Sequence, residues 1–312
     1  MKNTKRYLII IMIISILLTA VGCSGSKSTG AGTNVSGTTA YPLTVTDDTG
    51  NKVTLEKEPD KIVSLAPSTT EILFALGAGS KVVGRSEYDN YPEEAKKVSV
   101  VGGFSGPNTE LITKLAPQAV FAVKGSLTDD QKKLLESAGI KVIIFNPANI
   151  DGVYSNIKTA GQICNKQEKA KEITDSMEAK RQQIVSKLKD VKQKKVFIDL
   201  GSFYSAGKTS FIGSILTEIN AVNIAGNAAG QWPQLTAEQV VGQDPEVYIS
   251  LSTSLKDLQA VSGLSSTTAF KSGNVKVMEM GTLDNDIMQR PGPRIIDGLE
   301  VYAKTIYPDA FK

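Results

Sequence analysis

The sequence of 312 residues contains no histidine. Histidine is the usual general base at neutral pH, the commonest zinc ligand and the usual axial ligand of haem. Serine and aspartate are present, but without histidine or a reactive cysteine no triad-like catalytic set is visible. The net charge is only +3, and the basic residues do not cluster with interleaved aromatics as in a nucleic-acid site. We therefore expect no enzyme, no metal site, no cofactor and no nucleic-acid partner.

Cysteine is also scarce, and the first of the two, Cys23, ends a targeting segment. Lys2, Lys5 and Arg6 precede an apolar run over residues 8–18 that is short for a membrane span. The small residues before Cys23 resemble the lipobox of bacterial lipoproteins, although Ala20 stands where leucine is usual. The resemblance implies a signal peptide over residues 1–22 and lipidation of Cys23. Residues 23–40 are rich in serine, threonine and glycine and are typical of a flexible tether.

The second cysteine, Cys164, has no partner once Cys23 is lipidated, so we expect no disulfide. A buried thiol is the ordinary state of such a residue.

Residues 165–195 show the strongest helical pattern in the chain. No glycine or proline interrupts the segment, and strong helix formers fill it. Its apolar residues recur at the spacing of one helix face: Ala170, Ile173, Met177, Ile184, Leu188 and Val191. A helix of this length favours a strut between two lobes, although a surface helix of one large domain would also fit. We expect an N-terminal lobe over residues 41–160, the interlobe helix over 161–195 and a C-terminal lobe over 196–312.

Both flanks of the long helix alternate short apolar strands with helical patterns, which predicts α/β lobes with parallel sheets. In the first lobe we expect a hairpin over residues 43–55, strands at 62–65, 82–85, 119–123 and 142–145, and a glycine-rich loop at 101–105. Helices are expected after a capping box formed by Ser68 and Glu71, near Asn108, and after Thr128 and Gln131. Ligands of such sheets bind at the carboxyl ends of the strands, where Pro67, Tyr88 and Phe104 fall.

In the second lobe we expect strands at residues 196–200, 247–251 and 275–280. Helices are expected over 211–219, over 236–241 after a second capping box formed by Thr236 and Gln239, and over 294–306, with a polar loop at 281–293. Residues 201–209 nearly match a phosphate-binding loop, but Ser202 stands where the first glycine is required, which argues against a nucleotide site.

Aromatic residues are few, yet several fall in predicted loops after strands: Tyr88, Tyr91, Phe104, Tyr204 and Trp232. If they converge between two lobes, they give a large apolar contact surface with polar tips. Alternatively, each of these side chains packs at the end of its own sheet.

Several motifs in order carry a family resemblance. They are residues 62–77, 88–92, 101–104, 232–234, 238–240 and 290–294. Together they resemble the helical-backbone class of ABC-importer substrate-binding proteins, and within it most closely the vitamin B12 (cobalamin) binding proteins. The resemblance implies two Rossmann-like α/β lobes bridged by one long helix. It also implies an extracytoplasmic, lipid-anchored monomer that delivers cobalamin to an ABC permease.

The resemblance also assigns residues. Its corrin-contacting aromatics fall on Tyr88, Phe104, Tyr204 and Trp232, and its polar contacts on Asp286 and Arg290. Its permease-docking glutamates fall on Glu71 and Glu238. Both glutamates are expected in first helical turns, where capping and the helix dipole are an alternative role.

Other ligands remain open. Ferric siderophores are often anionic, and Arg85, Arg290 and Arg294 would suit them. Haem would need tyrosine or methionine on the iron because histidine is absent. Zinc or manganese capture is disfavoured for the same reason.

Overall fold

The computed structural model describes residues 38–103 and 105–312, and these residues form one compact unit. The signal peptide, Cys23, most of the tether and Phe104 lie outside the described residues. In the described part, no helix is long and apolar enough to cross a membrane.

The N-terminal lobe is built on a six-stranded sheet in the order β6-β5-β4-β3-β7-β8. All neighbours are parallel except β5 and β6, which are antiparallel. The bounds are β3 Ile62–Ser64, β4 Val82–Ser86, β5 Val100–Gly103, β6 Gly106–Pro107, β7 Ala119–Val123 and β8 Lys141–Phe145. A separate antiparallel hairpin, β1 Leu43–Thr46 with β2 Lys52–Leu55, confirms the predicted one.

Helices cover both faces of this sheet. They are α2 Pro67–Ala75, α3 Thr109–Leu115, α4 Asp129–Ser137 and α5 Ile150–Ile163. One small core lies between the sheet and α3 and α4, with Ile112 and Leu135 fully buried. The predicted caps are confirmed at Asn108, whose side chain accepts from Leu111 N–H, and at Thr128, which forms a capping box with Gln131.

The C-terminal lobe has a four-stranded, fully parallel sheet in the order β10-β9-β11-β12. Its strands are β9 Lys195–Asp199, β10 Val222–Asn223, β11 Val247–Ser250 and β12 Val275–Val277. Its helices are α7 Phe211–Glu218, α8 Ala237–Gln243, α9 Leu255–Gln259, α10 Thr268–Lys271, α11 Leu283–Gln289 and α12 Ile295–Ile306. The capping box of Thr236 and Gln239 opens α8 as predicted.

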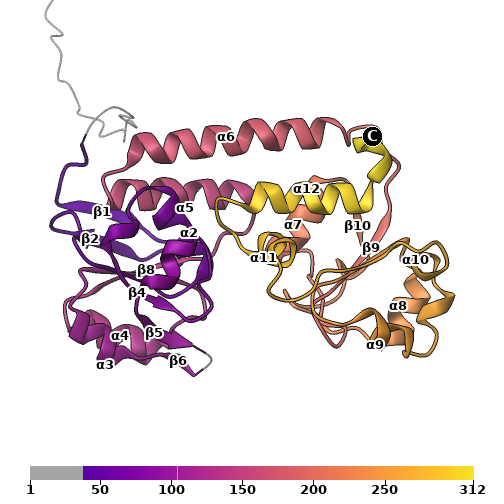
Figure 1. Cartoon of the computed structure of the whole chain (residues 1–312), viewed down its shortest axis with the longest axis horizontal. Helices are drawn as coiled ribbons and strands as arrows, with labels where there is room; N and C mark the ends of the chain where they lie inside the picture. The colour runs from indigo at the N-terminus through magenta and orange to yellow at the C-terminus, as the bar shows by residue number, and fades with distance from the viewer. Residues whose placement is uncertain (1–37, 104) are drawn as a thin grey trace, which may run out of the picture. The chain divides into compact units, whose positions relative to one another are not determined.

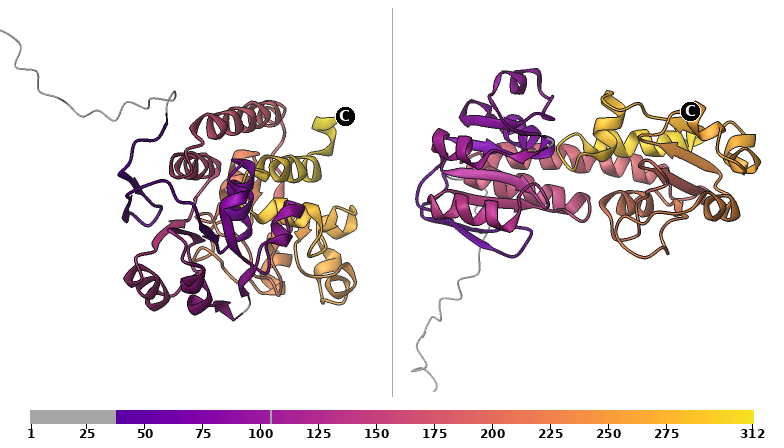
Figure 2. Two further views of the ribbon diagram at one scale, coloured as in Figure 1. Left: turned by 60° about the vertical axis from the view of Figure 1, so that its left-hand side comes forward. Right: turned by 90° about the horizontal axis from the view of Figure 1, so that it is seen from below.

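The long helix α6, Gln167–Ser186, lies across both lobes and packs beside α5 and α12 (Figure 1). Its apolar face joins a hydrophobic core that also contains Ile72 and Ile157 from the first lobe and Ile198 and Leu299 from the second. Each side chain of this size contributes ~1.5–3 kcal/mol when fully buried. Because one core continues from lobe to lobe, the two sheets share a single helical layer, which Figure 2 shows from below.

Arg181 of α6 connects the two lobes through ion pairs. Its guanidinium pairs with Asp151 at the start of α5 and with Glu218 at the end of α7, and it lies over the ring of Tyr154. The Nη1–Oδ1 distance to Asp151 is 2.6 Å. Hydrogen bonds to these carboxylates raise the pKa of Arg181, so the cation is permanent.

The expected fold of two α/β lobes bridged by a long helix is confirmed, but the helix is shorter than the pattern predicts. It ends at Ser186, and residues 187–194 turn toward β9. Leu188 is still buried and Val191 still packs on the core. The apolar spacing therefore continues past the helix end, which explains why the pattern predicts a longer element.

Three further predictions are wrong. Ser68 does not cap α2, because the helix starts at Pro67, two residues earlier than a cap at Ser68 requires, and its N-cap residue Ala66 makes no side-chain hydrogen bond. The glycine-rich segment at 101–105 contributes strand β5 rather than a loop. The polar segment at 281–293 contains α11, which Thr282 caps.

Candidate functional site

A cleft of about 520 Å³ lies where the carboxyl ends of strands from both sheets approach each other. From the first lobe it is lined by residues that follow β3, β7 and β8, and from the second by residues that follow β9 and by segments next to α7 and α11. The lining includes Pro67, Ser68, Lys124, Phe145, Pro147, Phe211, Trp232, Arg290 and Pro291. Loops at these strand ends are the ordinary ligand site of parallel sheets.

Trp232, the only tryptophan, lines this cleft with 48% of its surface exposed. Tyr88 and Tyr204 are also about half exposed, at 50% and 47%, on loops that follow β4 and β9. Neither is among the lining of the 520 Å³ hollow. Half-exposed aromatic side chains leave a large apolar area for a ligand to bury.

Tyr91 has another role. The guanidinium carbon of Arg294 lies 3.8 Å from the centre of its ring, a cation–π contact between the two lobes.

A strained backbone segment places Tyr204. Gly201, Ser202 and Phe203 all have positive φ, at 114°, 50° and 61°. Such a run is costly for residues with a Cβ and is found where neighbouring structure enforces it. Here the Tyr204 N–H donates to Gly201 O, and Tyr204 forms a β-bridge with Gln234, two residues after Trp232.

The segment is not a phosphate cradle. A Cβ on Gly207 would lie 2.4 Å from Gly230 O, so the backbone of Gly207 is covered by protein. The structure and the spacing of the motif therefore both argue against a nucleotide site.

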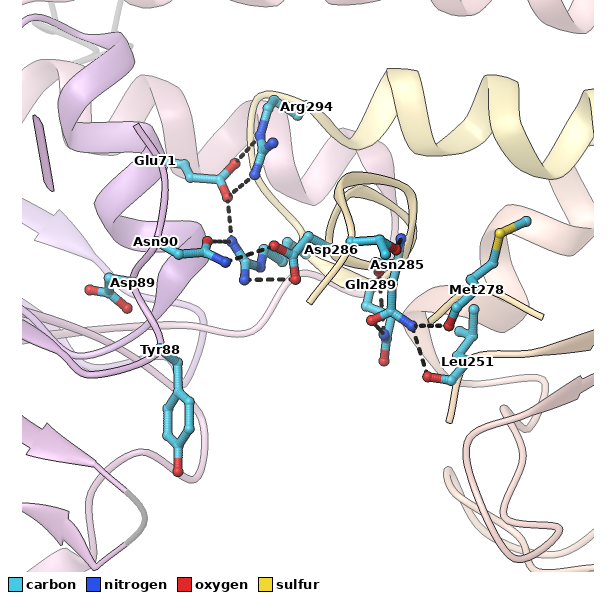
Figure 3. Close-up of polar contacts among 12 residues, drawn as sticks. Glu71, Tyr88, Asp89, Asn90, Leu251, Met278, Asn285, Asp286, Gln289 and Arg294 are labelled. Atoms are coloured by element: carbon cyan, nitrogen blue, oxygen red, sulfur yellow. Dashed lines mark hydrogen bonds and ion pairs between the residues drawn. The ribbon is translucent and has the colours of Figure 1, made fainter. Parts of the chain in front are cut away.

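Asp286 and Arg290, predicted polar contacts, belong to a group of partly buried ion pairs that joins the lobes around the buried Glu71 (Figure 3). Arg290 Nη2 lies 2.8 Å from Asp286 Oδ1, and Arg290 Nη1 lies 3.1 Å from Glu71 Oε1. Arg294 donates to both oxygens of Glu71, at 2.8 Å and 2.6 Å. Such paired bonds from arginine to a carboxylate are strong and fix the geometry.

Asn90 completes the group. Its side-chain oxygen accepts from Arg290 Nη1 at 2.6 Å, and its amide nitrogen donates to Asp286 Oδ2 at 3.0 Å. We call Glu71, Asn90, Asp286, Arg290 and Arg294 the interlobe clasp. Of these, Arg290 lines the cleft, whereas Asp286 holds Arg290 without lining the cleft itself. The charges of the clasp sum to zero, because two carboxylates face two guanidinium groups.

The loop that carries Tyr88 and Asn90 is fixed by the buried Asp89, which is 1% exposed. Its carboxylate accepts hydrogen bonds from Thr70 Oγ1 and from the N–H and Oγ of Ser86. Burial raises the pKa of Asp89, and these hydrogen bonds and the nearby charge of Arg85 oppose the rise.

Glu71 does not lie where its predicted docking role needs it. Its side chain is 2% exposed and bound by two arginines, so it is not a surface glutamate. Glu238 is exposed in the first turn of α8. Hydrogen bonds from its own backbone N–H and from Thr236 lower the pKa of Glu238, so the carboxylate is ionised at neutral pH.

Arg85 and Arg294, two of the three arginines that would suit an anionic siderophore, are not available in the cleft. Arg85 is buried in the first lobe and donates to the carbonyls of Ser86 and Lys96. Arg294 is held by Glu71 and does not line the cleft. Lys124 lines the cleft just after β7 and was not among the predicted site residues; its position after a predicted parallel strand is the signal that could have identified it.

Cys164 is buried and free, and burial raises the pKa of its thiol to about 12. Among the described residues, no group of histidine, cysteine or acidic side chains is arranged to hold a metal ion.

A second hollow, of about 720 Å³, borders the clasp. Phe74, Pro92, Val98 and Pro293 line it together with Glu71 and Arg294. It is the larger of the two, but it does not lie at the strand ends and has no tryptophan, so we regard the smaller cleft as the functional site.

Comparison with known proteins agrees with this geometry. Residues 62–280 match the periplasmic binding protein family. The chain belongs to this family. A Bacillus subtilis protein described as an uncharacterized ABC transporter substrate-binding lipoprotein, YvrC, is 36% identical over 311 residues, which are 96% of this chain and 97% of that protein. A cobalamin-binding protein of Halobacterium salinarum is 30% identical over 282 residues, covering 86% of this chain and 75% of that protein.

Solved structures of the same fold have diverse ligands. A possible iron-binding protein of Staphylococcus epidermidis is 29% identical with a TM-score of 0.70, covering 80% of this chain and all of that chain. The vitamin B12 binding protein of Vibrio cholerae is 22% identical with a TM-score of 0.71, covering 82% and 99%. A haem-binding protein of Roseiflexus is 21% identical with a TM-score of 0.71, covering 80% and 99%. The resemblance seen in the sequence is thus confirmed at the level of family and fold.

Proposed function

We propose that the protein is the extracytoplasmic substrate-binding component of an ABC importer and that it binds cobalamin or a related corrinoid in the interlobe cleft. The half-exposed Trp232 in the lining of the cleft, together with Arg290, whose charge is neutralised by Glu71 and Asp286, is the observation that carries the proposal. The Halobacterium relative described as cobalamin-binding supports it.

The chemistry of the cleft suits a broad, mostly apolar disc fringed with amides. Proline and aromatic side chains make up much of its lining. Such surfaces favour flat apolar ligands, and a few polar groups suffice to orient them. Arg290 can offer a hydrogen bond to an amide oxygen, but its charge is already matched by Glu71 and Asp286. A strongly anionic ligand would have to compete with these carboxylates for the guanidinium group.

Ferric siderophore binding is the second candidate, and Lys124 is the observation that favours it. Lys124 is exposed at the cleft, and it is the cation of the described lining that is not held by a carboxylate. One lysine is a small charge for a multiply charged anion, which usually meets several arginines or lysines.

Ligand titration separates these candidates. We expect the whole chain, purified in detergent, to bind cyanocobalamin with one-to-one stoichiometry in isothermal calorimetry. Binding of a ferric hydroxamate or of haem, with no heat from cyanocobalamin, would reject the corrinoid proposal. Turnover of none of these ligands is expected, because the family is one of binding proteins.

For docking on a permease we propose Glu238 together with Glu110 in place of Glu71. Glu110 is exposed in the first turn of α3, which Asn108 caps, as Glu238 is in the first turn of α8, which Thr236 caps. Figure 1 shows both helices on the side of the unit away from α6. Exposed carboxylates on both lobes suit arginines of a membrane partner.

Membrane attachment through Cys23 remains a proposal from the sequence. The lipoprotein relative in Bacillus subtilis supports it. Several acyl chains on one residue would hold the protein stably at a membrane surface. Replacement of Cys23 by serine should abolish incorporation of radiolabelled palmitate and release the protein from membranes; unchanged labelling would refute the site.

A further inference from the structure

We propose that Asn90 is a positioning residue for ligand binding: it orients Arg290 and Asp286 from the opposite lobe and links the width of the cleft to the loop that carries Tyr88. This inference rests on the proposed binding of a ligand between the lobes. Asn90 is the one uncharged member of the clasp. Its side-chain oxygen and its side-chain nitrogen both form hydrogen bonds with residues of the other lobe.

Asn90 acts on the cleft through Arg290. Nη1 of Arg290 donates to both Asn90 and Glu71, and Nη2 binds Asp286, so the guanidinium is held from two lobes. A long side chain fixed in this way loses little further conformational entropy when a ligand binds. Without Asn90 the guanidinium would keep its carboxylates but lose one of the two contacts that come from the first lobe.

Each end of this connection is anchored in its own lobe (Figure 3). In the first lobe, Asp89 ties the loop to Thr70 and Ser86 through buried hydrogen bonds. In the second lobe, the Asn285 side chain fixes α11 by donating to the carbonyls of Leu251 and Met278, both at 2.8 Å. A change in the distance between the lobes must therefore strain the bonds of Asn90.

Tyr88 lies on the same loop, two residues before Asn90, and is exposed to solvent. In Figure 3 the Tyr88 side chain extends away from the ion pairs, and half of its surface is exposed. A ligand that contacts Tyr88 would press on a loop whose next residues are Asp89 and Asn90. Ligand occupancy and the interlobe clasp should therefore influence each other, as linked equilibria require.

Three variants of the whole chain test the inference. Asn90→Leu removes both hydrogen bonds at similar volume and should weaken cyanocobalamin binding about tenfold, the effect of losing bonds to charged groups. Asn90→Asp keeps the acceptor for Arg290 and should give an intermediate affinity at pH 7.5. Asn274→Asp adds the same charge at an exposed position just before β12, at the opposite end of the strand from the cleft, and should bind like the unsubstituted protein.

The pH profile of Asn90→Asp distinguishes positioning from a general structural role. The new carboxylate would face Asp286 and Arg290 of the α11 segment. Behind Arg290 lie Glu71 of α2 and Arg294 at the start of α12, which stacks on Tyr91. Asp89 of the same loop is directed toward Thr70 and Ser86, and Tyr88 extends away from the ion pairs. Two carboxyl groups about 3 Å apart share a proton as the pH falls. That proton restores the donor toward Asp286. The affinity of this variant should therefore approach that of the unsubstituted protein between about pH 7.5 and about pH 4.5, when both are compared at each pH.

Hydrogen exchange tests the clasp without any ligand. Exchange of the amides in residues 283–294 should be several-fold faster in Asn90→Leu than in the unsubstituted protein and unchanged in Asn274→Asp. If the unsubstituted chain binds no ligand but this acceleration is seen, the proposed function fails and the clasp stands. Unchanged exchange and unchanged affinity in Asn90→Leu would overturn the inference, as would an affinity of Asn90→Asp that does not recover at low pH.

Discussion

Replacement of Trp232 by alanine probes the aromatic wall of the cleft. The indole is 48% exposed in the free protein, so a ligand that covers it would bury about half of a tryptophan surface. With ~250 Å² for the whole side chain, this is ~120 Å², or ~3 kcal/mol at ~25 cal/mol per Å². Incomplete coverage and polar losses reduce the net effect, so we expect an affinity loss of roughly 10- to 100-fold.

The matched control is Leu134→Ala on α4. Leu134 is 55% exposed and does not line the cleft, so its removal should leave ligand affinity unchanged. Both variants remove half-exposed side chains and should change the free energy of unfolding by less than ~1 kcal/mol. Calorimetric titration with cyanocobalamin measures the affinities and urea denaturation the stabilities. Equal affinity in the Trp232 variant and in the unsubstituted protein would refute the aromatic contact.

Three more predictions concern the clasp, the buried aspartate and docking. Glu71→Gln leaves Arg294 with a neutral partner in a buried site and should lower the free energy of unfolding by ~3–5 kcal/mol in urea denaturation; a loss below ~1 kcal/mol would show that the ion pairs contribute little. Because the pKa of Asp89 is raised above its ordinary value of 3.8 in the folded state, its contribution to stability is present at low pH and is lost as the pH rises through the raised value. Asp89→Asn should remove that part of the pH dependence, which begins near the ordinary value of 3.8 and extends upward, and an unchanged stability profile would argue against the shift. Glu110→Ala with Glu238→Ala should keep ligand affinity but lower uptake by a reconstituted importer, whereas normal uptake would rule out docking through these carboxylates.

Much of the fold follows from patterns within single elements. The strands β7, β8, β9 and β11 are short apolar runs bounded by polar residues, and their alternation with helices predicts parallel sheets. The caps at Thr128 and Thr236 follow from local hydrogen-bonding chemistry. These features depend on neighbours a few residues away, so the sequence contains them directly.

The interlobe clasp could not be predicted, because its partners are far apart in the chain. Glu71 bonds to Arg290 across 219 positions. Locally, Glu71 fits a capping box with Ser68, and this local reading is wrong because a buried pair with two arginines replaces it. Similarly, α11 escapes prediction because prolines and polar residues surround it, although Thr282 is a usable capping signal.

Arg290 shows how far the functional site can be predicted from the sequence. Its sequence motif identifies it as a polar residue near the ligand, but not as a cation already neutralised by Glu71 and Asp286. That neutralisation comes from tertiary contacts, and it supports the proposed uncharged, amide-rich ligand over the anionic alternative.

Tryptophan fluorescence tests the central claim most directly, because Trp232 is the only tryptophan and lines the cleft. Cyanocobalamin is titrated into the whole chain, and a parallel titration of free N-acetyltryptophanamide corrects for absorption by the corrinoid. We expect corrected quenching that saturates at one equivalent. Calorimetric binding of cyanocobalamin without any corrected change in the emission of Trp232 would place the ligand elsewhere and contradict the interlobe site.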